Sequence, residues 1–386
     1  MQTRKSIAIL LSRFPYPLDK GDKLRAYHQI KQLSRYYHIH LFALQDKEVK
    51  EKDRQALEPF CRSMTVYKPR TMVRYWQVLK SLLRAEPVQV GYFYDPKCKQ
   101  QWLIDIAQLK PDTLYAQLSR TALYVQDMPY HKVLDLQDAF ALNYDRMQAN
   151  MTGLRKWFYQ REARTMRLFE QKMIPSFDAC TIISDFDKSQ IAVQPNQVAV
   201  VPNGVDTQFF KAKQVKPIYD ILFCGNLTYI PNQQAVNYLI HELLPALVQK
   251  KPDIRMFIVG TGGEALQQYS HANLTVGGWI EDIRQAYSLS RLFVAPLFSG
   301  AGLQNKLLEA MSMGLPCITT SIANASLLAV PDEEIILAGN VDEFVEKILS
   351  LLNDTAKQSH LSTQARHRVE KDYSWESANR VLMSLL

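Results

Sequence analysis

Residues 291–320, RLFVAPLFSGAGLQNKLLEAMSMGLPCITT, contain the features that indicate the fold. Apolar runs at 291–297 and 316–320 predict two short strands, and an amphipathic helix is expected between them over 303–313. Gly314 is expected to end this helix in a left-handed conformation, with a proline just beyond it. The predicted buried stripe of the helix consists of Leu303, Leu307, Ala310 and Met311. The stretch therefore predicts a strand, a loop, a helix and a second strand in succession.

The polar side of this helix and the loop before it predict a binding site. The polar face consists of Asn305, Lys306, Glu309 and Ser312. Gly300 and Gly302 allow the backbone to turn tightly and to approach a ligand closely. A helix N-terminus with Lys306 beside it suits a diphosphate, and Glu309 can accept hydrogen bonds from two ribose hydroxyls. An exposed lysine–glutamate pair behind an ordinary loop explains the spacing equally well.

The same alternation of apolar runs and amphipathic stretches extends along the whole chain. Strand-like runs in the C-terminal half lie at 219–225, 254–260, 273–278, 291–297, 316–320 and 334–339. Those of the N-terminal half are SIAILLS, HIHLFAL, MTVYKP, DTLYAQ, HKVLDL, CTIIS and QVAVVP. A long, mostly polar helix is expected from about Ala139 to Met173. Short strands that are apolar on both faces indicate parallel sheets between layers of helices. The expected fold class is therefore α/β, with two doubly wound domains joined near VPNGVD (201–206).

Composition and charge limit the possible partners. With 386 residues, the chain is long enough for two hydrophobic cores. Its five cysteines are scattered and show no C-x-x-C spacing, which favours a reducing compartment over disulfides or a zinc site. Residues 1–100 hold 20 Lys and Arg against 9 Asp and Glu, whereas residues 201–386 hold 15 against 18. We expect a cytoplasmic protein without a membrane span, with different partners for its two halves.

Several motifs together resemble a known family. These are GLQNKLLEAMSMGLPCITT, VPNGVD, FCGNLTYIPN and, near the end of the chain, YSWE. In combination they resemble the retaining GT-B glycosyltransferases of family 4, and most of all bacterial sugar transferases of exopolysaccharide clusters. The resemblance covers nearly the whole chain. It implies two Rossmann-like domains facing a cleft, over residues 1–205 and 206–373, with a C-terminal helix at 374–386 that packs back on the first domain.

The resemblance also implies roles for particular residues. Glu309 matches the glutamate that binds the donor ribose, and Lys306 is expected to stabilise the charge of the leaving diphosphate. Gly21 matches the glycine-rich loop of the first domain that closes over the phosphates. Trp279 and Ile280 correspond to positions whose side chains usually line the pocket for the nucleotide base. The loop whose amides meet the sugar and the distal phosphate matches Gly300, Ala301, Gly302 and Leu303.

The sequence departs from the family pattern at three positions. The first glutamate of the usual pair is replaced by Ala301, and the arginine that often follows F-x-G is Asn226. The histidine of the common His-Asp pair is Gln137, followed by Asp138. Asp138, or the nearby Asp135, is a candidate to orient or deprotonate an acceptor hydroxyl, although aspartates at strand ends are as often caps.

A D-x-D motif and two basic, aromatic stretches add weaker signals. Asp185 and Asp187 form a D-x-D that opens a helix, where capping is more probable than metal binding. We therefore expect neither a metal nor a cofactor. Residues 70–84, and with less weight 154–167, mix basic and aromatic side chains as in helices that rest on anionic membranes. A solvated basic face is the alternative, and no recognised module supports nucleic-acid binding.

Taken together, the sequence predicts a retaining, metal-independent hexosyltransferase of surface-glycan synthesis. Its expected donor is a UDP-, GDP- or ADP-linked sugar, and its acceptor is a glycan or a lipid-linked saccharide. A non-hydrolysing nucleotide-sugar epimerase shares the architecture and is one alternative. A degenerate GT-B subunit that binds without turnover is the other, suggested by Ala301, Asn226 and Gln137.

Overall fold

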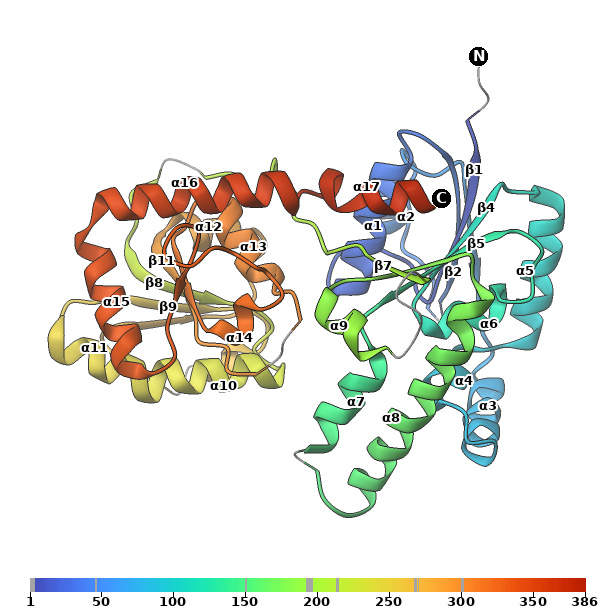
Figure 1. The fold of residues 1–386 in the computed structure, drawn as a ribbon, viewed down its shortest axis with the longest axis horizontal. Coiled ribbons are helices and arrows are strands. Elements are labelled where there is room, and N and C mark those ends of the chain that lie inside the picture. Colours follow the sequence, from blue (N-terminus) through green and yellow to red (C-terminus); the bar gives the residue numbers. More distant parts are fainter. Residues whose placement is uncertain are drawn as a thin grey trace. The chain divides into compact units, whose positions relative to one another are not determined.

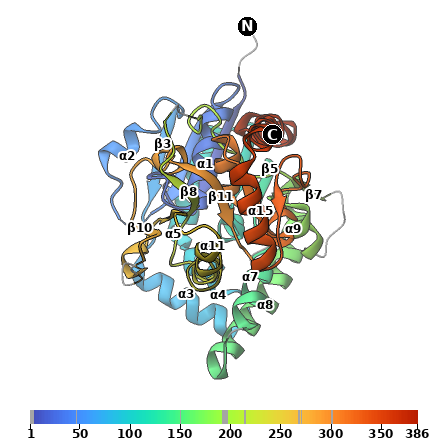
Figure 2. The same cartoon turned by 90° about the vertical axis from the view of Figure 1, so that its left-hand side faces the viewer.

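The chain forms two compact α/β units in a computed structural model (Figures 1 and 2). The structure describes residues 4–45, 47–149, 151–191, 197–212, 215–266, 269, 271–299 and 302–386. The first unit comprises Met1–Pro202 and Asn379–Leu386, and the second comprises Asn203–Ala378. The joint expected after Val205 lies just beyond this division.

The first unit is built on a seven-stranded sheet with the order β3-β2-β1-β4-β5-β6-β7. Every neighbouring pair of these strands is parallel, as predicted. The strands are β1 (Ser6–Leu11), β2 (His38–Leu44), β3 (Ser63–Tyr67), β4 (Thr113–Gln117), β5 (His131–Gln137), β6 (Ala179–Ile182) and β7 (Val198–Val200). The helices are α1 (Gly21–Leu33), α2 (Glu51–Gln55), α3 (Thr71–Leu83), α4 (Val88–Phe93), α5 (Pro96–Leu109), α6 (Ala122–Val125), α7 (Phe140–Ala149), α8 (Gly153–Met173) and α9 (Asp185–Gln190). The unit also includes the part of α17 (Trp375–Leu385) from Asn379 onward.

Both faces of this sheet are covered by apolar side chains. Ala8 and Leu10 of β1 point into a core that includes Trp102 and Ile106 of α5. The alternate β1 residues point into a second core, formed with α1 and with Leu382 of α17. Because successive side chains of a strand face opposite ways, one apolar strand serves both layers.

A buried ion pair ties α1 to the middle of the sheet. Arg25 of α1 and Asp135 of β5 are 1% and 0% exposed, and the guanidinium donates to both carboxylate oxygens at 2.7 and 3.0 Å. Tyr115 and Thr181 also donate to Asp135, and Arg25 donates to the carbonyl of Pro202. Asp135 was considered above as a possible group for the acceptor, but its burial and its four donors make it structural.

The helical segment expected from about Ala139 to Met173 consists of two helices. α7 and α8 run antiparallel, and the backbone of Gly153 at the start of α8 has a φ of +59°. Two glutamates on the buried side of α8 cap other helices. Glu170 accepts from the N–H of Phe140 at the start of α7, and Glu162 accepts from the N–H of Val88 at the start of α4. The apparent polarity of this segment therefore reflects buried helix caps as well as solvent exposure.

The second unit has a six-stranded parallel sheet with the order β10-β9-β8-β11-β12-β13. Its strands are β8 (Tyr219–Cys224), β9 (Met256–Val259), β10 (Leu274–Gly277), β11 (Ser290–Ala295), β12 (Cys317–Thr319) and β13 (Ile336–Leu337). Its helices are α10 (Ile230–Tyr238), α11 (Leu244–Lys250), α12 (Arg284–Ser288), α13 (Asn305–Ser312), α14 (Ser321–Asn324), α15 (Val341–Asn353) and α16 (Thr355–Asp372), with a π-helical turn at Leu239–Leu243.

Helix α13 ends as predicted at Gly314. Gly314 has a φ of +72°, its N–H donates to Met311, and the N–H of Leu315 donates to Ala310, each at 3.0 Å. This pair of bonds is the Schellman arrangement that closes a helix. The predicted start of the helix was too early, because Leu303 lies in the preceding loop and is only partly buried against the core. Ser312, expected on the polar face, is buried and donates to the carbonyl of Phe210.

We predict that Arg25→Met and Asp135→Asn each lower the stability of the first unit by about 3–5 kcal/mol, because each leaves one buried polar group without its partner. The double variant should lose less than the sum of the two single losses, since neither charge then remains. Differential scanning calorimetry of the transition assigned to the first unit measures the three changes. Strict additivity would show that the two groups do not act as a pair.

Candidate functional site

The candidate site of the second unit lies at the carboxyl ends of its strands. β8 ends at Cys224 and is followed by a loop that leads into α10, while the loop after β11 leads into α13. The side chain of Gln304, the residue before α13, does not cap the N-terminus of this helix. This edge of a parallel sheet is where open α/β folds bind ligands.

Lys306 is held in a largely desolvated position at this edge. Its ammonium lies 5.0 Å from the centre of the Phe223 ring and donates to the side-chain oxygen of Asn232. A Cβ atom on Gly225 would lie 3.4 Å from Nζ, so the glycine leaves the room that the lysine occupies. Burial lowers the pKa of Lys306 to about 8, against the opposing effect of Cys224 and Glu309. A cation held this way gains more from an anionic ligand than a solvated lysine does.

Glu309 lies one turn further along α13 and is oriented by a buried tyrosine. Tyr287 donates its hydroxyl hydrogen to Oε2 of Glu309 at 2.9 Å, and the thiol of Cys224 lies 3.0 Å from the same hydroxyl. Burial raises the pKa of Glu309 to about 7, while Tyr287 and Lys306 act in the opposite direction. Within the described part of the chain, no hydrogen bond engages Oε1. One oxygen is therefore fixed and the other remains to accept from a ligand.

Asn226, which stands where the family often has an arginine, holds the loop after β8 in place by hydrogen bonds. Its side-chain oxygen accepts from the N–H and the hydroxyl of Thr228, at 3.0 and 2.7 Å. Its carbonyl accepts from the amide of Asn232 at 2.7 Å, and Asn232 in turn binds Lys306. Asn226 thus fixes the loop that positions Lys306. Asn232, Tyr287 and Cys224 could not be identified from the sequence alone, because each acts through a contact with a distant segment.

The other residues expected around the donor are only partly described. Gly300 and Ala301 lie outside the described residues. Gly302 accepts from the side chain of Gln304 at 2.9 Å, and a Cβ atom there would meet open space. Trp279 follows β10 and is 68% exposed, whereas Ile280 packs against the core. No described contact joins Trp279 to Lys306 or Glu309.

In the first unit, the expected residues lie at the carboxyl ends of β1 and β5. Gly21 is the first residue of α1, whose N-terminus has no side-chain cap, and a Cβ atom there would meet open space. Asp138 is half-buried just after β5. Gln137 is 5% exposed, has a φ of +64°, and its buried amide nitrogen lacks a partner among the described residues. This conformation is strained for a residue other than glycine, and such strained residues are often found at functional sites.

Arg120 is a residue that the sequence did not reveal. Its guanidinium lies 4.7 Å from the centre of the Phe93 ring and 5.8 Å from that of Phe140. Burial, together with the positive charge of Arg13, lowers the pKa of Arg120 to about 10. In the described part of the chain it forms no ion pair, and its Nε has no hydrogen-bond partner. A half-buried cation of this kind favours an anionic ligand.

The D-x-D motif is part of a helix cap. Ser184, not an aspartate, is the capping residue of α9, and its hydroxyl accepts from the N–H of Asp187 at 3.1 Å. The same hydroxyl donates to the carboxylate of Asp187 at 2.5 Å. Across the described residues, no three histidine, cysteine, aspartate or glutamate side chains are grouped as a metal site requires.

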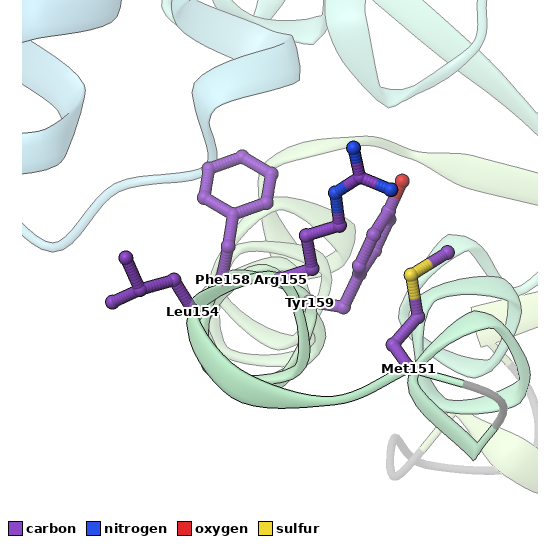
Figure 3. Close-up of a pocket in the computed structure, with 5 residues that line it drawn as sticks. All are labelled: Met151, Leu154, Arg155, Phe158 and Tyr159. Carbon is purple, nitrogen blue, oxygen red and sulfur yellow. The ribbon is translucent and has the colours of Figure 1, made fainter.

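A separate hollow of about 330 Å³ lies in the first unit, at the start of α8 (Figure 3). It is lined by Met151, Leu154, Arg155, Phe158 and Tyr159. None of these residues belongs to the strand-end sites described above. The hollow is mostly apolar, with the guanidinium of Arg155 beside the Tyr159 ring in the close-up.

Comparison with known families finds a match for most of the second unit. The model of the family described as Glycosyl transferases group 1 matches residues 218–354, a range that runs from β8 into α15 and includes both Lys306 and Glu309. This part of the second unit is therefore similar to a glycosyl transferases group 1 domain. The matched range contains both Lys306 and Glu309 of the candidate site.

Similar proteins extend the comparison beyond the matched range. A Klebsiella pneumoniae protein, the "Uncharacterized 44.6 kDa protein in cps region", is 22% identical over 391 residues, covering 95% of this chain and 96% of its own. The Escherichia coli UDP-Gal:alpha-D-GlcNAc-diphosphoundecaprenol alpha-1,3-galactosyltransferase is 27% identical over 193 residues, which are 43% of this chain and about half, 48%, of that protein. Anabaena Alr3699/HepE, solved in complex with UDP and glucose, has a TM-score of 0.68 at 15% identity over 98% of both chains. The fold is GT-B, and residues 218–354 are similar to group 1 glycosyl transferases.

We predict that binding of a nucleoside diphosphate, tested with UDP, weakens as the pH rises from 7 to 9. The pKa of Lys306 is about 8 in the free protein, and a bound diphosphate should raise it, so binding at pH 8–9 requires proton uptake. The dissociation constant should increase by about tenfold over this range, since one proton is linked to binding. Isothermal titration calorimetry at each pH, in buffers of different ionisation enthalpy, measures the constant and the proton uptake.

Lys306→Arg is the control for this titration, because a guanidinium keeps its charge up to pH 9. Its UDP affinity should change much less with pH. An equally steep dependence in the variant would assign the titration to another group.

Proposed function

We propose that the protein transfers a hexosyl group from a nucleotide-sugar to a glycan or lipid-linked acceptor, with retention of the anomeric configuration. The observation that carries this proposal is the pairing on α13 of a desolvated lysine and an oriented glutamate, one turn apart, at the strand ends of the second unit and within the range that matches the group 1 family. Lys306 suits the diphosphate, and Oε1 of Glu309 suits a ribose hydroxyl. A UDP-linked donor is favoured over GDP- and ADP-sugars, because Alr3699/HepE was solved with UDP and the E. coli relative is named for UDP-Gal.

In the proposed reaction, the bond between the anomeric carbon and the donor phosphate oxygen breaks. The acceptor hydroxyl oxygen bonds to the same face of that carbon, and its proton passes to the departing phosphate oxygen. Negative charge grows on the diphosphate during this step, and Lys306 with the backbone N–H groups before α13 stabilises it. No metal ion is required in this scheme, since the cation is supplied by the chain.

The acceptor would bind the first unit at the ends of β4 and β5. Asp138 is proposed to orient the acceptor hydroxyl, and Arg120 would meet an anionic group of the acceptor, such as a phosphate. The five cysteines are free thiols, which supports action in the cytoplasm. Synthesis of a surface polysaccharide from the cytoplasmic face of the membrane is the proposed setting, in keeping with the cps-region relative.

A thermal-shift panel of UDP-, GDP- and ADP-sugars tests the donor, because a ligand of the folded state raises the unfolding temperature. Incubation of the best donor with candidate acceptors, followed by NMR of the product's anomeric proton, then tests retention. Full activity in EDTA would support the metal-independent scheme, and an inverted product would overturn the proposed mechanism.

We predict that Lys306→Met lowers kcat by about 10²–10³-fold and affects donor affinity less, because the charge that it stabilises grows in the transition state. Steady-state kinetics of donor hydrolysis or transfer gives kcat and KM separately. Lys250→Met, an exposed lysine at the end of α11, is the matched control and should behave as wild type. A loss confined to KM would make Lys306 a ground-state binder only.

We predict that Glu309→Ala weakens donor binding by about 10–100-fold, the usual effect of losing a charged acceptor of hydroxyl hydrogen bonds. Calorimetric titration measures the affinity, and circular dichroism verifies the fold. Glu346→Ala, at an exposed position on α15, serves as control. Unchanged affinity in a folded Glu309→Ala protein would exclude the ribose assignment.

A further inference from the structure

Helix α3 has its polar face turned inward and its apolar face turned outward. The buried residues of α3 are Arg74, Gln77 and Ser81. Its exposed face carries Met72, Tyr75, Trp76, Leu79 and Leu83, with exposed fractions from 47% to 84%. These five positions recur at helical spacing and so form one stripe. A surface helix of a globular protein normally shows the opposite arrangement.

The packing of α3 against α4 fixes this orientation. The guanidinium of Arg74 lies 4.8 Å from the centre of the Tyr92 ring and 6.0 Å from that of Phe93. Ser81 approaches Gly91 so closely that a Cβ atom on the glycine would lie 2.1 Å from the serine oxygen. The apolar side chains of α3 cannot replace these inward groups without breaking the contacts, so the stripe stays outside.

Helix α8 extends the same surface. Arg161 of α8 donates to the carbonyls of Ser81 and Leu82 at the C-terminal end of α3, at 2.7 and 3.2 Å. One turn before it, Trp157 is 60% exposed, and Leu154 is 86% exposed at the rim of the hollow drawn in Figure 3. Helices α3, α7 and α8 lie together on one side of the first unit in both views (Figures 1 and 2).

The charges that accompany these apolar side chains are positive. α3 contains no acidic residue, and both glutamates of α8, Glu162 and Glu170, are buried. The basic residues facing outward around the stripe are Arg84, Arg155, Lys156 and Arg164. Glu86, just after α3, is the nearby exposed acid. Apolar and basic side chains therefore share one surface, which we call the α3–α8 surface.

Two residues of the basic stretch expected to meet a membrane have other roles. Arg70 forms an ion pair with the buried Asp95 at 2.9 Å, and Arg74 lies on the inward face. Their positive charge is already used within the fold. The charge available to a partner comes instead from Lys80, Arg84 and α8. The larger contribution to membrane binding is expected from the apolar stripe.

We propose that the α3–α8 surface binds an anionic lipid bilayer, with α3 lying in the plane of the interface and its apolar stripe inserted among the acyl chains. Aromatic and aliphatic side chains on one face, with basic residues at the border, are the composition of helices that lie in membrane interfaces. A second copy of the chain fits this surface less well, because a two-fold contact would bring the same basic residues together. Among the described residues, no helix is both long and apolar enough to cross a bilayer.

This inference does not rest on the proposed transferase reaction. Vesicle binding needs neither donor nor acceptor, and the surface shares no residue with the strand-end sites. Failure of the transferase assay would not contradict membrane binding, and absence of vesicle binding would not contradict the transferase reaction.

The test is co-sedimentation of the full chain with vesicles of phosphatidylglycerol and phosphatidylethanolamine, and with phosphatidylcholine vesicles. We expect wild type to pellet with the anionic vesicles. The stripe variant Tyr75→Ser/Trp76→Ser/Leu79→Ser should bind about tenfold or more weakly, since three apolar side chains no longer insert. The charge variant Arg84→Gln/Arg155→Gln/Lys156→Gln should bind less tightly and lose most of its dependence on salt.

Leu103→Ser/Ile104→Ser on α5 is the matched control, because both side chains are exposed in the same unit but away from this surface. It should pellet like wild type. Quenching of tryptophan fluorescence by brominated acyl chains should report insertion directly; it should decrease in Trp76→Phe and be lost in Trp76→Phe/Trp157→Phe, since both side chains are exposed on this surface. Absence of vesicle binding by wild type would overturn the proposal, as would a concentration-dependent dimer that the stripe variant abolishes.

Discussion

The buried ion pair between Arg25 and Asp135 is the constraint on which the first unit depends. Neither group can exist unpaired in the core, because an isolated charge there is far less stable than one in water. The pair therefore fixes α1 over the sheet, and the bond from Arg25 to Pro202 fixes the chain where this unit ends. The uncapped start of α1 and the strand ends that carry Gln137 and Asp138 are held in place as a consequence.

The fold could be predicted from the sequence because parallel sheets impose a simple pattern. Each strand must be apolar on both faces. Runs such as HIHLFAL and YDILFC meet this requirement, and they alternate along the chain with amphipathic helices. The end of α13 at Gly314 could also be predicted, since the left-handed conformation there favours a residue without a Cβ atom. The division of the segment into α7 and α8 could not be predicted in the same way. The glutamates of α8 that cap neighbouring helices look like surface residues until their partners are known.

The candidate site could be predicted only in part. Lys306 and Glu309 were found because they share one face of one helix, which spacing alone reveals. Burial gives them unusual pKa values, and the side chains that surround and orient them, Phe223, Asn232 and Tyr287, are far away in sequence. The departures from the family pattern also look different in three dimensions. Asn226 holds the loop that positions Lys306, so its lack of charge does not leave that position without a function.

The close fit of Ser81 against Gly91 has a consequence for the behaviour of the protein in solution. A helix held there cannot roll about its own axis, so the molecule has no conformation that hides the stripe of α3 while the fold is intact. Its colloidal stability must come from the like charges around the stripe, which repel neighbouring copies. Those charges are screened as ionic strength rises, so the chain would salt out earlier than its net charge suggests, and a mild detergent would do more to keep it dispersed than added salt.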